Sequence, residues 1–256
     1  PIVGLEPTNF VVSENGRPVA EVTIDSSGSS VTTLDTVAVV QPRSGTPYIE
    51  DVARAIHDIA DALPANDPFV LYTAGDEPAI IAERPAGPEL FAERTAAALI
   101  ERDGEYARDD VALDRAIRLA TSGLVTRGLR RNLIVVGDGR VGDSAFSEYG
   151  IEEIAAYLVN NGVRLHLVLV EQRTPDNEFS FLVERTNGTT RYAYEPSGVA
   201  PLVADFADVP VGRYWLAYTS VGDPDFGRAY IDISVEARIF VRSGRDEIGF
   251  FPPGES

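Results

Sequence analysis

The stretch at residues 37–63 constrains the fold more than any other, because it contains an apolar run, a loop and an amphipathic segment in direct succession. Residues 37–40 (Val-Ala-Val-Val) are purely apolar, without polar alternation, which is typical of a strand buried on both faces of a parallel sheet. After the loop 41–47, apolar residues recur at spacings of three and four from Tyr48 to Leu63, which predicts a helix with one buried face. This order predicts an α/β domain, in which ligands bind at the loop after the strand.

The alternation of strand and helix patterns continues to about Ala207. We expect buried strands at residues 69–73, 133–136 and 163–170, an antiparallel return at 79–82 and an edge strand at 190–194. Helices are expected at residues 88–102, 109–124, 146–161, 174–186 and 199–207. The predicted fold class is therefore α/β: a three-layer, doubly wound, mostly parallel sheet of the Rossmann-like kind.

Both ends of the chain show the two-residue period of β-strands instead. Asn15-Gly16 is a hairpin signal near the N-terminus, and residues 214–219, 229–241 and 248–251 are predicted strands. Because isolated hairpins are at best marginally stable, we expect the two ends to pair into one small sheet domain. The predicted domains are residues 1–33 and 210–256, as two segments of an accessory β domain, and residues 34–209, as the α/β domain.

The charge balance argues against two classes of partner. Lys plus Arg number 22 against 40 for Asp plus Glu, so the formal net charge is −18 and the surface repels nucleic-acid phosphates and anionic lipid. The chain has no Cys, which excludes Cys-ligated metals, and no apolar run approaches the roughly 20 residues that span a bilayer. We therefore expect neither nucleic-acid binding nor membrane insertion.

Several segments, in order along most of the chain, resemble the von Willebrand factor type A domain of bacterial surface proteins. Residues 36–40, followed by Ser44 and Gly45, resemble the first strand and metal loop of that family. Residues 133–139 (Leu-Ile-Val-Val-Gly-Asp-Gly) resemble the strand that ends in Thr-Asp-Gly, and residues 186–192 a late Thr-Gly-Gly segment. The resemblance implies a non-enzymatic adhesion module that binds another protein, at a cell surface, outside the cell or in the periplasm.

The metal-ion-dependent adhesion site of that family departs from its pattern on this chain. The family binds Mg²⁺ through Asp-x-Ser-x-Ser, a Thr and an Asp, and the matching positions here carry Gln41, Arg43, Gly45, Val111 and Asp138. Arg cannot ligate a cation and places a positive charge where the ion would lie. The resemblance therefore implies a degenerate site with no metal and no cofactor. Either the guanidinium of Arg43 replaces the cation and pairs with Asp138, or Arg43 is a solvated loop residue.

The expected binding residues lie in the two apical loops of the predicted sheet. They are Gln41, Arg43, Ser44, Gly45, Asp138, Gly139 and Arg140.

Two other functions fit parts of the sequence. Residues 137–142 spell the G-x-G-x-x-G fingerprint of dinucleotide-binding loops, but the predicted helix begins only near Phe146, and Glu171 lies far beyond the usual position of the ribose-binding acid. The terminal strands also allow a structural protomer that assembles into an extracellular filament through its sheet edges. No enzyme is expected, because His57 and His166 lie away from the apical loops and no nucleophile motif occurs.

Overall fold

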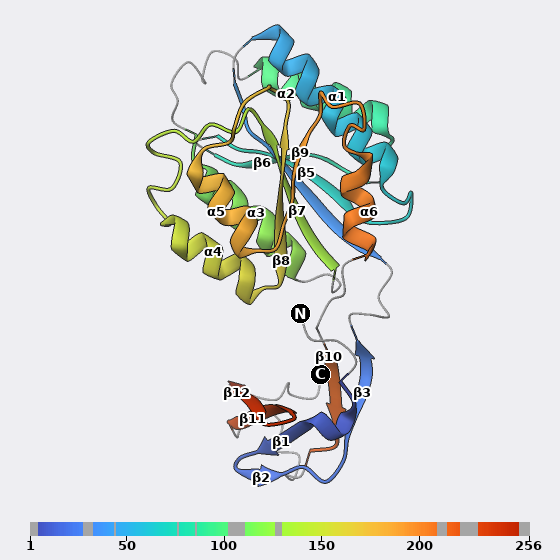
Figure 1. Cartoon of the computed structure of the whole chain (residues 1–256), viewed down its shortest axis with the longest axis vertical. Coiled ribbons are helices and arrows are strands. Elements are labelled where there is room, and N and C mark those ends of the chain that lie inside the picture. Colours follow the sequence, from blue (N-terminus) through green and yellow to red (C-terminus); the bar gives the residue numbers. More distant parts are fainter. Residues whose placement is uncertain are drawn as a thin grey trace. The chain divides into compact units, whose positions relative to one another are not determined.

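The computed structural model in Figure 1 describes residues 5–27, 33–43, 45–75, 77–84, 86–101, 111–125, 130–208, 214–220 and 230–250. The chain separates into two compact units, and each is described by itself. The α/β unit is Val31–Val209, and the β unit combines Pro1–Ser30 with Pro210–Ser256. Within the described ranges, no helix combines the length and the apolar character that a membrane crossing requires.

The α/β unit is built on a sheet whose described strands follow the order β6-β5-β4-β7-β8-β9. The strands are β4 (Leu34–Val40), β5 (Phe69–Thr73), β6 (Ala79–Glu83), β7 (Arg130–Gly137), β8 (Val163–Leu169) and β9 (Thr190–Tyr192). All neighbouring pairs are parallel except β5 and β6, the predicted antiparallel return. Strands β4 and β7 are buried at every position, including the polar residues in their first halves, and their apolar runs 37–40 and 133–136 predict burial on both faces.

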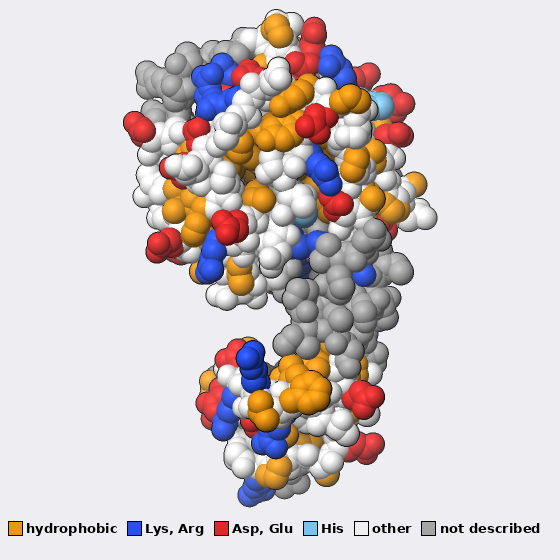
Figure 2. Space-filling model, viewed as in Figure 1, with side chains coloured by type: hydrophobic (Ala, Val, Ile, Leu, Met, Phe, Trp, Pro, Cys, Tyr) orange, Lys and Arg blue, Asp and Glu red, His pale blue; other side chains and the backbone are white. Residues whose placement is uncertain are grey.

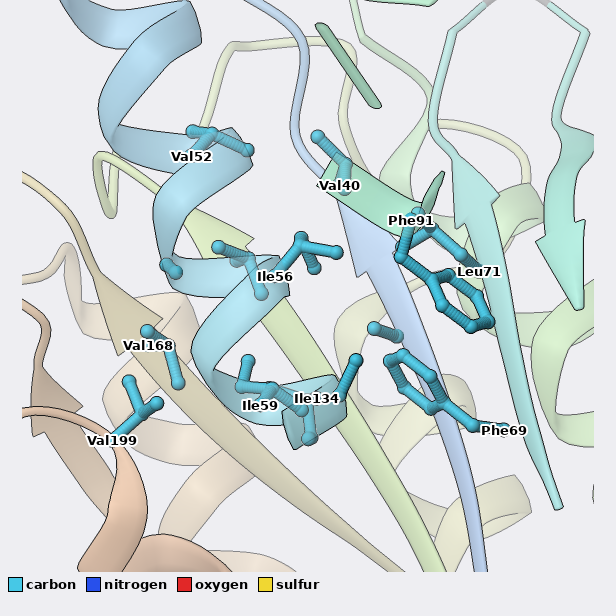
Figure 3. Packing of buried hydrophobic residues seen from close by; sticks show 14 of the residues in the cluster. Val40, Val52, Ile56, Ile59, Phe69, Leu71, Phe91, Ile134, Val168 and Val199 are labelled. Atoms are coloured by element: carbon cyan, nitrogen blue, oxygen red, sulfur yellow. The ribbon is translucent and has the colours of Figure 1, made fainter. Parts of the chain in front are cut away.

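Helices cover both faces of this sheet, so the predicted three-layer fold class is confirmed (Figure 1). One face carries α1 (Thr46–Ala62), α2 (Pro88–Glu101) and α6 (Ala200–Asp208), and the other carries α3 (Leu113–Val125), α4 (Ile151–Asn160) and α5 (Asn177–Arg185). Helix α1 directs Ile56 and Ile59 into the same cluster as Val40 and Ile134 of the sheet (Figure 3). Each large apolar side chain buried in this way contributes roughly 1.5–3 kcal/mol.

The β unit contains strands from both ends of the chain. Its elements are the short helix η1 (Pro7–Asn9) and the strands β1 (Phe10–Glu14), β2 (Arg17–Pro18), β3 (Val22–Ser27), β10 (Tyr214–Tyr218), β11 (Ile231–Ile239) and β12 (Arg242–Phe250). Strands from the two ends pair with each other, and they form two sheets within this unit. A four-stranded sheet has the order β12-β11-β1-β2, and β3 pairs separately with β10. The rings of Phe10 and Tyr214, one from each sheet, lie 5.3 Å apart, so the second sheet packs on the first.

Two predicted boundaries are also wrong. Helix α4 begins at Ile151 and not near Phe146, because the backbone N–H groups of Glu148 and Tyr149 donate to the buried Asp114 carboxylate, each at 2.9 Å. The predicted strand 229–241 stops at Ile239, and the chain returns as β12 through residues expected to form a turn. The predicted helix start at residue 109 lies outside the described residues.

Candidate functional site

The carboxyl ends of β4, β7 and β8 lie together at one edge of the sheet, because these parallel strands are neighbours. In the sheet, β4 lies between β5, the next strand in the chain, and β7, so the strand order reverses direction at β4. Ligands of open α/β sheets bind at such a switch point. An open pocket of about 900 Å³, here called the apical pocket, lies over this edge. Its lining includes Gln41, Arg43, Val111, Asp138, Arg140, Asp143, Glu171, Arg173 and Asp176.

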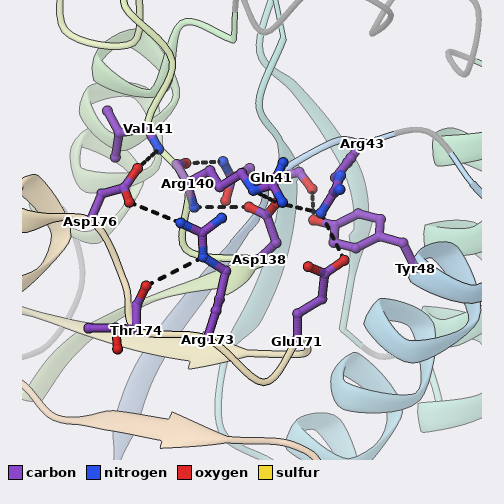
Figure 4. Close-up of polar contacts among 10 residues, drawn as sticks. All are labelled: Gln41, Arg43, Tyr48, Asp138, Arg140, Val141, Glu171, Arg173, Thr174 and Asp176. Atoms are coloured by element: carbon purple, nitrogen blue, oxygen red, sulfur yellow. Dashed lines mark hydrogen bonds and ion pairs between the residues drawn. The ribbon is translucent and has the colours of Figure 1, made fainter.

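Arg43 bridges two carboxylates in this pocket (Figure 4). Its Nη1 donates to Asp138 Oδ2 at 2.7 Å and to Glu171 Oε1 at 2.8 Å. The Asp138 side chain is 3% exposed and the Arg43 side chain 35% exposed. Partial burial lowers the pKa of Arg43, but the carboxylates of Asp138 and Glu171 outweigh it, so the pKa is raised. Of the two alternatives that the sequence leaves open for Arg43, the structure has the ion pair with Asp138.

Asp138 is engaged through both oxygens. Its Oδ1 accepts the backbone N–H of Arg140 at 2.9 Å, and its Oδ2 lies 3.4 Å from Arg140 Nε in addition to its bond with Arg43. A buried carboxylate requires this kind of compensation, because an unpaired buried charge is strongly destabilising. Asp138 therefore joins the β4 and β7 loops through charge-assisted hydrogen bonds.

Gln41 fills the space between the same two loops. Its Nε2 donates to the backbone carbonyl oxygen of Arg140, and the backbone carbonyl oxygen of Gln41 accepts the Tyr48 hydroxyl from α1. Burial, reinforced by the Asp138 carboxylate, raises the pKa of Tyr48 well above its ordinary value, so this hydroxyl stays a donor. A Cβ atom at Gly137 would lie 2.4 Å from Gln41 Oε1, so the glycine at 137 makes room for the Gln41 side chain.

The loop between β8 and α5 completes the network. Asp176, at the N-cap of α5, accepts the Val141 N–H at 2.9 Å and Arg173 Nη2 at 3.1 Å. The backbone N–H of Asp176 donates to the carbonyl of Gly139, a residue whose φ of +79° favours glycine. Sequence reasoning missed Arg173 and Asp176 and considered Glu171 only as a ribose-binding acid. The available signal was that Glu171 lies just beyond β8, the neighbour of β7 in the sheet.

The predicted binding residues fall into three groups in the structure. Gln41, Arg43, Asp138 and Arg140 line the apical pocket, together with Val111, the position matched to the threonine ligand. Gly139 shapes the loop beneath the pocket, and Gly45 is the N-cap of α1 with φ +115°. Ser44 lies outside the described residues.

The glycines at 137–142 do not form a dinucleotide cradle. Helix α4 begins at Ile151, so no helix N-terminus follows Gly142 directly. The loop N–H groups of Arg140 and Val141 already donate to the carboxylates of Asp138 and Asp176, which would repel a pyrophosphate.

Comparisons with known proteins place the fold. No family model and no curated protein matches the chain. Among solved structures, the conserved hypothetical protein BatB from Bacteroides thetaiotaomicron is 15% identical, with a TM-score of 0.50 over 68% of this chain and 100% of that one. The manganese-loaded TRAP protein of Plasmodium vivax is 14% identical (TM-score 0.49, covering 96% of this chain and 100% of that one). A von Willebrand factor type A protein from Catenulispora acidiphila is 10% identical (TM-score 0.45, covering 95% and 70%).

At these identities the likeness concerns the fold. It agrees with the sheet order and with the helices on both faces of the sheet. The chain therefore carries a domain with the von Willebrand factor type A fold.

Proposed function

We propose that the chain is a non-enzymatic module that binds another protein through the apical pocket, with a fixed guanidinium in place of a metal ion. The observation that carries this proposal is the position of Arg43, whose Nη1 lies within hydrogen-bonding distance of two carboxylates at the carboxyl edge of the sheet. A cation between two carboxylates is the role that the family resemblance assigns to Mg²⁺.

The residues present do not fit a divalent ion. Mg²⁺ requires an octahedral set of oxygen ligands, but Val111 and Gly45 offer no side-chain oxygen, and both oxygens of Asp138 already accept hydrogen bonds. Among the described residues, no group of three or more His, Asp or Glu side chains could hold a metal. These observations support a pocket that works without a bound cation.

The charges of the pocket support binding over catalysis. Asp138, Glu171 and Asp176 each pair with an arginine, so none of them is placed as a general base. His57 is half-exposed on α1 beside Asp58, and His166 is buried in β8. On the face shown in Figure 2, acidic and arginine side chains are interspersed over the α/β unit without a continuous basic stripe, which supports a protein partner over nucleic acid.

The filament alternative has less support from the β unit. Edge strand β12 carries Arg242, Arg245, Asp246 and Glu247, and charges on an edge strand oppose pairing with another edge. Asp246 lies opposite Val235, so one of these charges is on the side of the sheet that also carries apolar residues. The proposal places the module outside the cytoplasm, at a cell surface or in the periplasm, as the resemblance implies.

The proposal is tested by partner capture with matched charge reversals. Arg140, which is about half-exposed at the pocket, is changed to Glu, and Arg54 on the exposed side of α1 is changed to Glu as the control. We expect Arg140→Glu to abolish capture of a partner that wild type and Arg54→Glu both retain, in Mg²⁺ and after the addition of EDTA. A partner retained by Arg140→Glu, or released by EDTA, would contradict the proposed site.

A further inference from the structure

The tip of the β11–β12 hairpin displays two large apolar side chains to solvent. Phe240 is 102% exposed and Val241 is 100% exposed, so neither side chain contributes to a core. Ile239 pairs with Arg242 in the ladder, so Phe240 and Val241 are the two central residues of a tight turn. Because neither side chain buries surface, neither stabilises the fold, and the two adjacent apolar side chains are available to a partner.

The backbone at the tip adds a second, independent observation. Phe240 has φ +53°, in the left-handed region that favours glycine, and Val241 is not in that region. A turn with positive φ only at its first central residue corresponds to type II′, where glycine normally occupies that position. A phenylalanine there costs conformational free energy without burial to offset it, and residues held in such conformations cluster at functional sites.

The hairpin holds this tip in a fixed position. Strands β11 and β12 pair over nine consecutive positions, from Ile231 with Phe250 to Ile239 with Arg242. The ladder orders the backbone on both sides of the tip, so binding of a partner there costs little backbone entropy. The geometry is that of an anchor presented on a fixed backbone.

The charge beside the tip indicates what the anchor meets. Arg238 pairs with Glu236 and Arg245 with Glu247, but the side chain of Arg242, next to the tip, has no ion pair or hydrogen bond with any of the described residues. An exposed aromatic beside an unpaired arginine has the composition of a protein-interface hot spot. On the face of the β unit shown in Figure 2, hydrophobic and arginine side chains are exposed together.

We propose that the Phe240-Val241 tip is a docking site for a protein partner that offers an apolar pocket for Phe240 and a carboxylate at its rim for Arg242. A lipid surface fits less well, because the net charge of −18 opposes approach to anionic membranes. A second copy fits less well, because the apical pocket is lined mainly by polar and charged side chains. This site is separate from the apical pocket and does not depend on the function proposed for it.

Thermal unfolding of the full chain tests the first half of the proposal. Phe240→Gly suits the backbone of the turn and removes no buried surface, so we expect an unfolding temperature equal to or above that of wild type. A lower unfolding temperature would show that Phe240 supports the fold, and would overturn the proposal.

Site-specific cross-linking tests the second half. A photoreactive phenylalanine analogue replaces Phe240 in the full chain, with the same analogue at Tyr194, a partly exposed aromatic of the α/β unit, as the control. The protein cross-linked only from position 240 is purified, and its dissociation constant is measured. We expect at least tenfold weaker binding for Phe240→Gly and for Arg242→Glu, and an unchanged constant for Tyr194→Ala.

Several results would overturn the proposal. They are the absence of a position-specific cross-link, a cross-link to a second copy of the chain, and unchanged affinity of Phe240→Gly. Co-sedimentation of wild type, but not Phe240→Gly, with vesicles of phosphatidylcholine and phosphatidylglycerol would assign the tip to lipid instead.

Discussion

Removing the charge of Arg43 has a cost that can be estimated from the geometry. Arg43→Met keeps most of the aliphatic stem but leaves the Asp138 carboxylate buried without its main cation. Exposed ion pairs contribute about 0.2–1 kcal/mol, whereas breaking a buried pair costs about 3–5 kcal/mol. Because Asp138 is 3% exposed and Arg43 35% exposed, we expect an intermediate loss of about 2 kcal/mol. In a unit of this size such a loss lowers the unfolding temperature by about 4–8 °C.

A double-mutant cycle isolates the interaction itself. Urea unfolding of wild type, Arg43→Met, Asp138→Asn and the double variant should give a coupling energy of about 2 kcal/mol. The matched control is the exposed pair of Arg54 and Asp51 on α1, for which Arg54→Met and Asp51→Asn should show no measurable coupling. A coupling below about 0.5 kcal/mol between Arg43 and Asp138 would refute the reasoning.

Three further predictions concern stability. Burial and the nearby Arg164 lower the pKa of His166 to about 3, so between pH 6.5 and 3 the unfolded chain binds more protons than the folded chain, and stability falls as the pH falls. From pH 8 to about pH 5, the free energy of unfolding measured in urea should fall by about 2 kcal/mol more for wild type than for His166→Gln. Equal decreases would contradict a buried, neutral histidine. Gly137→Ala should lower the free energy of unfolding by about 1–3 kcal/mol, because the new methyl group clashes with Gln41. Adding Gln41→Ala to this variant should restore part of the loss. An unchanged free energy of unfolding for Gly137→Ala alone would argue against the close contact. Asp114→Ala should cost about 2 kcal/mol and speed amide hydrogen exchange at Glu148 and Tyr149, since both N–H groups lose their acceptor; unchanged exchange would speak against this role of Asp114.

The layers of the α/β unit were predictable because buried strands and helix faces require apolar residues at regular spacings in the sequence. The apolar runs of β4 and β7 are typical of strands covered on both faces, and the spacing of Ile49, Val52 and Ile56 indicates the buried side of α1. Their order in the chain then places the loops after β4 and β7 at one edge of the sheet. Arg43 and Asp138 were therefore brought together by topology before any side chain was positioned.

What the sequence did not reveal depends on contacts between distant residues. The late start of α4 follows from Asp114, which is 34 residues from Glu148 and has no local signature for that role. The turn at Phe240 lacks the glycine or asparagine that is typical of a hairpin, so the predicted strand 229–241 ran through the turn and the first part of β12 was expected to be a turn. Asp176 falls inside the predicted helix 174–186, but it is the N-cap of α5, and its carboxylate accepts the Val141 N–H of another loop.

The most direct test of the central claim is the unfolding temperature of wild type and of Arg43→Ser in Mg²⁺ and in EDTA. The account predicts that wild type does not respond to either, because a guanidinium already lies between Asp138 and Glu171. It predicts that Arg43→Ser, which supplies a hydroxyl and releases two carboxylates, becomes more stable in Mg²⁺ than in EDTA. A wild-type unfolding temperature that rises with Mg²⁺ and falls with EDTA would contradict it.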